Sequence, residues 1–239
     1  MADVNALNLL LRVTDLLDAL HAFGLQDPVL LPEGSPERVA SERIRAHLRG
    51  HAERLRALGA TADAPAADAI DWTAGGGSFA GPFQLVFFDG WELSRVMQLL
   101  HDLSVRAWLG QMDALAADPA AYEAGVRMHA TAARYAAQVR WNRQAAELTD
   151  AKPWITGAQP GFDFSLFPPA EEGAPSQLDV AAMVYGVDDQ SGTAPAASSG
   201  EDNRVQGRVT LPAEPASSEA YDEPLAAEKV AAVLTLFVP

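Results

Sequence analysis

Histidine supplies the most reactive side chains in this chain, which has no cysteine. His51 lies in the stretch from Ser35 to Gly59, which is typical of a capped amphipathic helix. It is the one ionisable residue on a face whose other members are Ile44, Leu48, Leu55 and Leu58. An imidazole on an apolar face can bind a metal ion, or it can be a neutral core group with a hydrogen-bond partner.

His101 is the second histidine expected near the centre of the protein. His51 and His101 could face each other and hold one zinc, copper or nickel ion. A further ligand could come from one of four other residues: His47, Asp102, His129 or Tyr135. Asp102 directly follows His101, however, and so points about 100° away from it around a helix. Because no third ligand clearly converges, the sequence favours neutral histidines bonded to Thr14, Tyr135 or backbone, with no metal and no other cofactor.

Other catalytic patterns are weak. The segment HLRGH at 47–51 has the histidine spacing of the HExxH metalloproteases but lacks the glutamate that acts as the base. The glycine run 75–77 is not followed by the Lys-Ser/Thr of a phosphate-binding loop, and the chain has no G-x-S-x-G elbow. The absence of cysteine excludes disulfides, cysteine nucleophiles and cysteine-ligated metals. The sequence therefore favours a protein that is not an enzyme.

Charge sets further limits on function. The 239 residues include 32 acidic and 17 basic side chains, for a formal net charge of −15, which argues against a nucleic-acid surface. Three arginines of one expected helix, Arg134, Arg140 and Arg143, are interpreted as a solvated face or as partners of acidic groups, with an anion site as the alternative. The sequence identifies no partner and leaves a homo-oligomer open.

The N-terminus begins MADVNALNLLLRVTD and has no basic segment before its apolar run, which Arg12 and Asp15 interrupt. This pattern fits neither a Sec signal nor a membrane span. It favours a cytoplasmic protein, and export stays open if a signal has been removed.

Four long amphipathic patterns must position these histidines, and they predict a mainly α-helical protein. The helices are expected at Val4–Phe23, between Ser35 and Gly59, at Trp91–Ala117 and at Pro119–Leu148. Helices of this length predict an antiparallel four-helix bundle made of two helix pairs over residues 1–151. The link from Gly59 to Trp91 is long enough to cross the bundle.

Residues 152–239 have a different composition, rich in Pro, Gly, Ser and Ala. Leu178–Val187 and Val205–Leu211 have strand-like content and could pair as a short β-ribbon. The segment 222–238 returns to a helical pattern, with Asp222 as the expected cap and Pro224 in the first turn. Because the apolar content of this region is too small for a separate core, we expect an irregular extension, ending in a short helix, that packs on the bundle.

Four segments together resemble a known family. They are RAHLRGHAERLRALGA at 45–60, HDLSVRAWLGQM at 101–112, RMHATAARYAAQVRWNR at 127–143 and AYDEPLAAEKVAAVLTLFV at 220–238. They are similar to the ferritin-like-domain family that includes the desiccation-related proteins of plants and bacteria. The resemblance implies a ferritin-like bundle with a long crossover and a role in desiccation or other stress.

Metal-binding members of such bundles hold two metal ions with a Glu from each of two helices and a Glu-x-x-His from each of the other two. The equivalent positions here are Thr14, Leu48, His51, His101, Ala132 and Tyr135. The set retains His51 and has no carboxylate, so two dications would leave about four positive charges uncompensated in a low-dielectric core. We therefore expect a non-catalytic protein with a structural, binding or stress-related role; the alternative is a metal-binding protein or enzyme with a mononuclear site at His51 and His101.

Overall fold

The computed structural model describes residues 2–145, 175–185 and 224–239. Within these ranges the chain forms seven α-helices and two 3₁₀ turns, and no β-strand. The α-helices are α1 Val4–Gln26, α2 Pro36–Ala57, α3 Gly90–Gly110, α4 Met112–Leu115, α5 Pro119–Ala145, α6 Gln177–Tyr185 and α10 Ala227–Phe237, and the 3₁₀ turns are η1 Ala67–Ala69 and η2 Gln84–Phe87. The predicted helical class is confirmed for these residues.

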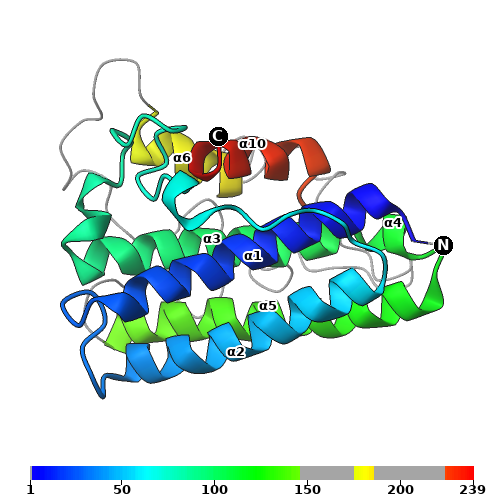
Figure 1. The fold of residues 1–239 in the computed structure, drawn as a ribbon, viewed down its shortest axis with the longest axis horizontal. Coiled ribbons are helices and arrows are strands. Elements are labelled where there is room, and N and C mark those ends of the chain that lie inside the picture. The colour runs from blue at the N-terminus through cyan, green and yellow to red at the C-terminus, as the bar shows by residue number, and fades with distance from the viewer. Residues whose placement is uncertain (1, 146–174, 186–223) are drawn as a thin grey trace, which may run out of the picture.

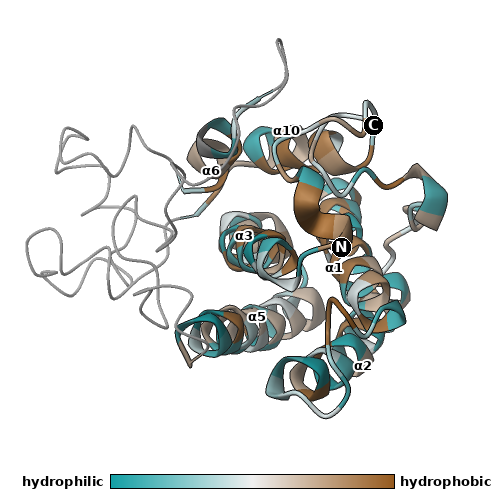
Figure 2. Cartoon of the chain, turned by 90° about the vertical axis from the view of Figure 1, so that its left-hand side faces the viewer, coloured by the Kyte–Doolittle hydropathy of each residue, from teal (hydrophilic) through white to brown (hydrophobic). Residues whose placement is uncertain are grey.

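The four long helices pack side by side as a bundle (Figure 1). Helix α1 pairs with α2 and α3 pairs with α5, as the sequence predicts, and α1 also contacts α3. Figure 1 shows the link between α2 and α3 returning along the length of the bundle, so that these two helices run in the same direction. The view along the bundle in Figure 2 places the four helices at the corners of a square.

The ends of α2 follow its local sequence. The Ser35 hydroxyl accepts a hydrogen bond from the Arg38 amide (3.1 Å), and Pro36 occupies the first turn. Gly59 has a φ of 108°. The amides of Gly59 and Ala60 donate to the carbonyls of Arg56 and Leu55, which is the Schellman arrangement. Because both caps lie in the local sequence, they can be predicted without knowledge of the fold.

Two helix ends differ from the prediction. Helix α1 continues past Gly24 to Gln26, and Gly24 instead allows close packing, since a Cβ there would lie 2.8 Å from Leu93 and 2.9 Å from Leu31. Helix α3 ends at Gly110 and α4 follows as a separate turn, where a single helix was expected. A Cβ on Gly110 would lie 2.1 Å from the Leu225 carbonyl, so the C-terminal segment crosses α3 at backbone distance.

The extension contains a helix where a strand was predicted. Residues 177–185 form α6, and its buried residues Val180, Ala181 and Val184 have helical spacing. The strand interpretation of Leu178–Val187 is therefore wrong over these residues, because a short apolar run suits either structure and packing against α3 favours the helix. Val205–Leu211 and the proposed boundary at 151 lie outside the described residues.

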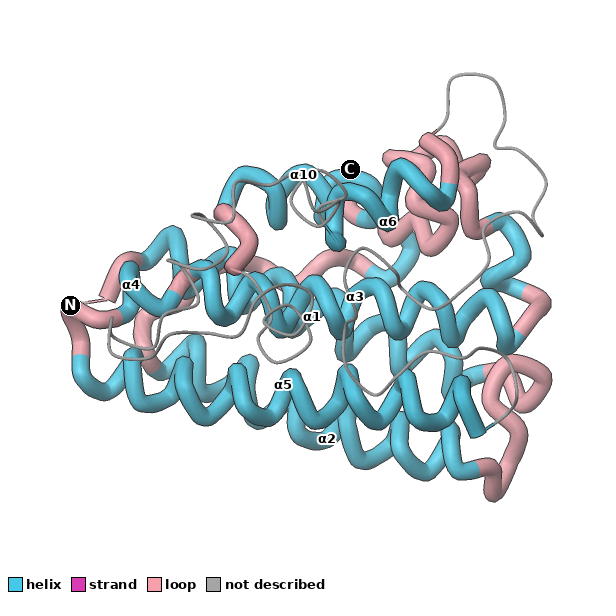
Figure 3. The backbone as a smooth tube through the Cα atoms, turned by 180° about the vertical axis from the view of Figure 1, so that it is seen from behind, coloured by secondary structure: helices cyan, strands magenta, loops and turns pink. Residues whose placement is uncertain are grey.

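The last helix begins later than predicted. Pro224 precedes α10 instead of lying in its first turn, and Asp222 lies outside the described residues. The Leu225 amide donates to the Arg106 carbonyl (3.1 Å), which holds this segment against α3 before the helix starts at Ala227. Helices α6 and α10 contact each other and cover α3, and α10 also covers α1 (Figures 2 and 3). None of the described helices is both long enough and apolar enough to span a membrane.

Candidate functional site

Two buried histidines form the centre of the bundle. His21 of α1 and His101 of α3 are 0% and 1% exposed, and their Nε2 atoms lie 2.9 Å apart. One ring must donate and the other accept, so the accepting imidazole is neutral. Burial lowers the pKa of His21 to about 3, and burial followed by the neighbouring His21 lowers the pKa of His101 well below its ordinary value.

His21 is the residue that the sequence interpretation missed. It follows Leu10 and Leu17 at helical spacing, so it lies on the buried stripe of α1. That spacing could have placed His21 in the core. Its partner is 80 residues away in the chain, so the pairing itself cannot be found from local sequence.

The six positions equivalent to metal ligands are placed unequally. Five are buried: Thr14, Leu48, His101, Ala132 and Tyr135. The Thr14 hydroxyl donates to the Leu10 carbonyl (2.7 Å), while Leu48 and Ala132 are part of the hydrophobic core. The sixth, His51, is half-buried in an open groove between α2 and α5. The structure thus pairs His101 with His21 and places His51 in a different environment.

Tyr135 lies between these two environments. Its ring makes an edge contact with His101 (centroids 6.3 Å apart) and stacks on His47 (5.9 Å), and its hydroxyl is hydrogen-bonded to His47 Nδ1. Burial raises the pKa of Tyr135, which keeps its hydroxyl protonated. The roles depend on the histidine tautomer: the hydroxyl can donate to a bare Nδ1, which places the proton of a neutral His47 on Nε2, or it can accept from an Nδ1–H.

The buried carboxylates have partners elsewhere. Asp102 accepts hydrogen bonds from Arg140 of α5 and from the Tyr185 hydroxyl of α6 (2.8 Å). Glu92 accepts from Arg95 and from the Gln177 amide, both at 2.8 Å. These bonds join α3 to α5 and α6. Among the described residues, no three His, Asp or Glu side chains converge closely enough to hold a metal ion.

Two of the three arginines expected on a solvated face are buried. Arg140 is 1% exposed and Arg143 is 3% exposed, and they bond to Asp102 and Gln98 of α3. The solvated-face interpretation is therefore wrong for both, whereas Arg140 does pair with an acidic group, Asp102, as the other interpretation expects. The solvated-face interpretation fails because α3 is covered on most sides and offers buried polar groups that need partners. Arg134 is exposed, as expected.

The glycine-rich loop after η1 binds a carboxylate from its own chain. Asp71 is fully buried, and its two carboxylate oxygens accept from the amides of Thr73, Gly77 and Phe79, each at 3.0 Å. Converging backbone amides form the kind of nest that binds phosphate in other proteins. Here Asp71 occupies it.

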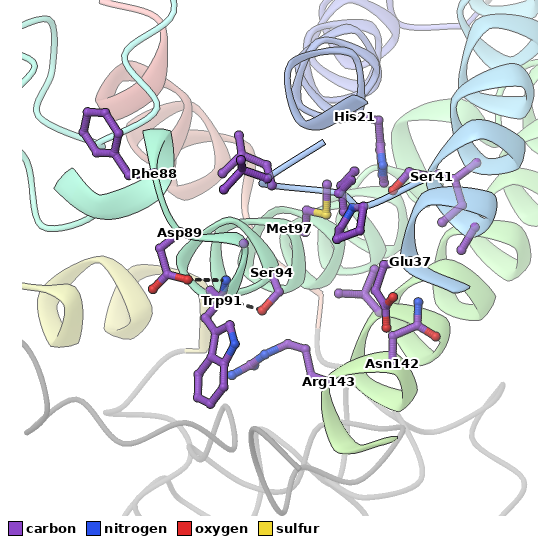
Figure 4. A pocket seen from close by; sticks show the side chains of 18 residues that line it. His21, Glu37, Ser41, Phe88, Asp89, Trp91, Ser94, Met97, Asn142 and Arg143 are labelled. Atoms are coloured by element: carbon purple, nitrogen blue, oxygen red, sulfur yellow. Dashed lines mark hydrogen bonds between the residues drawn. The ribbon is translucent and has the colours of Figure 1, made fainter. Parts of the chain in front are cut away.

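A pocket of about 400 Å³ opens at the end of the bundle where α1 meets α2 (Figure 4). Most of its wall is apolar and includes Leu30, Leu31, Ala40, Ile44, Met97 and Val139. Its mouth has three exposed apolar side chains: Val29, Phe88 and Trp91. His21 and Ser41 lie on one side of the pocket and Trp91 on the other (Figure 4).

The polar atom that distinguishes this pocket is His21 Nδ1. This atom is buried and has no hydrogen-bond partner among the described residues, whereas Nε2 of the same ring is bonded to His101. Leaving a buried polar atom unpaired costs about 1–3 kcal/mol. The pocket is a binding-site candidate because His21 lines it; Nδ1 itself has almost no accessible surface, so a ligand would reach it only after a shift of the neighbouring side chains.

Comparisons with protein-family models, characterised proteins and solved structures gave no significant match to this chain.

Proposed function

We propose that this protein is a non-catalytic bundle of the ferritin-like type that binds a small, mainly apolar molecule in the pocket at the end of the bundle. The long return from α2 to α3 and the two helix pairs support the ferritin-like part of the proposal. A binding role is compatible with the stress-related function that the sequence resemblance implies.

The unpartnered His21 Nδ1 is the observation on which the binding function depends. The ring is neutral, and the charged lining residues Glu37, Asp89 and Arg143 include both signs, so no single charge selects the ligand. A hydroxyl can donate to a bare nitrogen or accept from an N–H, and so it complements either tautomer of the ring. The pocket volume lies within the range of small-molecule sites. The proposed ligand is therefore a compact, uncharged alcohol or phenol with an apolar body.

A mononuclear metal site at His51 and His101 has less support. His101 is bonded to His21, and His51 lines the groove with His47. A site at the bundle centre would have to use His21 and His101, and each buried carboxylate of the described residues already bonds to other groups. The binding proposal therefore takes precedence over the metal proposal.

Filling the pocket tests the proposal. Ala40 is a wall residue that is 5% exposed, and Ala40→Leu adds apolar volume to the cavity. Ala57→Leu is the matched control, since it makes the same change at an exposed position of α2 outside the pocket. A panel of phenols and small alcohols would be screened by ligand-observed NMR, with binders confirmed by shifts of the His21 ring nitrogens.

We expect at least one phenol or alcohol to bind the wild type and Ala57→Leu, to shift the His21 Nδ1 resonance, and to lose binding in Ala40→Leu. The hydrocarbon analogue without the hydroxyl should bind more weakly. Equal binding to Ala40→Leu, with that variant folded by circular dichroism, would place the site elsewhere and refute the assignment.

A further inference from the structure

We propose that the groove between α2 and α5 binds a phosphate monoester, with Arg43 and Arg134 as the main anion ligands. The groove has a volume of about 640 Å³, and α2 provides Arg43, His47 and His51 while α5 provides Arg134 and Tyr135. It shares no lining residue with the pocket at the end of the bundle. This inference therefore goes beyond the proposed function and does not depend on it.

The charge of the groove is opposite to that of the chain. The protein has a formal net charge of −15, yet the lining of the groove contains two arginines, two histidines and no carboxylate. Exposed charges more than about 10 Å apart are largely screened at physiological salt, so the nearby cations determine the local potential. A small anion that reaches this groove meets cations at close range.

These two arginines differ from the neighbouring arginines in their ion pairing. Arg45 and Arg49 of α2 pair with Asp18, and Arg56 pairs with Asp15, both of α1. Arg43 and Arg134 have no carboxylate within ion-pair distance in the described part of the chain. Both side chains are therefore available to an anion from solution, one from each wall.

Hydrogen-bond donors of fixed position accompany the arginines. His47 Nδ1 is hydrogen-bonded to the hydroxyl of the buried Tyr135, which holds the ring and leaves Nε2 free of that contact. The Arg134 guanidinium donates to the Thr131 hydroxyl (3.1 Å), which orients the side chain along α5. Arginine forks and N–H donors are the groups that bind the oxygens of a phosphate.

The ligand class follows from the size and chemistry of the groove. A phosphate dianion has three terminal oxygens that can accept from the two arginines and from an imidazole N–H. The groove is larger than an inorganic phosphate requires and leaves room for an organic group beside it. A phosphate monoester therefore suits the groove better than inorganic phosphate does.

Titration calorimetry on the full-length protein tests the proposal with two probes, phenyl phosphate and inorganic phosphate. The variants Arg43→Gln and Arg134→Gln each remove one proposed ligand. Arg54→Gln is the matched control, because Arg54 is an exposed arginine of α2 that does not line the groove and has no ion pair among the described residues.

We expect saturable binding of phenyl phosphate that weakens about tenfold or more in Arg43→Gln and Arg134→Gln and is retained in Arg54→Gln. Inorganic phosphate should bind more weakly than phenyl phosphate. Three results would overturn the proposal: no saturable binding, an equal loss in Arg54→Gln, which would indicate a general charge effect, or equal affinity for the two probes, which would remove the role of the organic group.

Discussion

Acidification should destabilise this protein because His21 is buried as a neutral imidazole. Burial, with a smaller contribution from Arg45, lowers the pKa of His21 from 6.5 to about 3. In the unfolded chain the same ring takes up a proton below about pH 6.5. Above that pH both states are neutral and the residue has no effect on stability. Between about pH 6.5 and about pH 3 the unfolded state gains the proton first, so stability falls as the pH falls.

The size of the effect follows from the pKa of His21. Each pH unit in this window lowers the free energy of unfolding by about 1.4 kcal/mol for one such histidine. His21 alone therefore lowers it by about 2 kcal/mol between about pH 6.5 and about pH 5. His101 acts in the same direction, because its pKa is also lowered. Glu92 acts in the opposite direction, because burial raises its pKa and acid then favours the folded state.

Urea unfolding followed by far-ultraviolet circular dichroism at several pH values measures the effect. His21→Phe keeps a ring in the core and removes the titrating group, so its stability should fall less between about pH 7 and about pH 5, by about 2 kcal/mol. His129→Phe is the control, since that histidine is only half-buried and its removal should leave most of the slope. If His21→Phe and the wild type lost the same free energy over this range, the neutral histidine pair would be refuted.

Three further outcomes are expected. Tyr185→Phe removes one hydrogen bond to the buried Asp102 carboxylate and should lower the unfolding free energy by about 1–3 kcal/mol, measured by urea denaturation. Gly81→Ala places a Cβ 2.2 Å from the Thr73 carbonyl, so the 71–81 loop should become more sensitive to limited proteolysis. Gly50→Ala is the control, because its Cβ meets no atom within 4 Å. Protein purified without chelator should hold less than one equivalent of transition metal by mass spectrometry. The non-metal interpretation would be contradicted if the wild type held one equivalent of metal and the His51→Ala, His101→Ala double variant held none.

Features set by a few neighbouring residues could be predicted from the sequence. The Ser35 cap and the Gly59 Schellman motif depend on residues within one turn of each helix end, and both form as expected. The apolar spacing of the long helices likewise predicts their pairing. Gly24 shows the limit of this approach, because the same residue type can end a helix or admit a neighbouring side chain, and only the packing against Leu93 distinguishes them.

The candidate sites were harder to predict than the helix ends, because they depend on contacts between residues far apart in the sequence. The sequence allows His51 and His101 to face each other, but in the structure His21 of α1 is the partner of His101. Arg140 and Arg143 are charged residues of a kind usually found on a solvated face. They are buried because they bond to polar groups on α3, and no pattern in the sequence of α5 predicts those partners. The end-of-bundle pocket is formed by four separate segments, so its cavity has no signature in any one of them.

The different surroundings of α2 and α3 explain where binding sites can form in this bundle. Helix α3 contacts α1, α5, α6 and α10, so its polar side chains Gln98, His101 and Asp102 are consumed by internal hydrogen bonds. In the described part of the chain, helix α2 packs mainly on α1 and α5, and its polar residues Arg43 and His51 are exposed and half-buried, respectively. The polar side chains of α3 therefore serve stability, while the groove along α2 and the pocket at the N-terminal end of α2 are cavities open to a ligand.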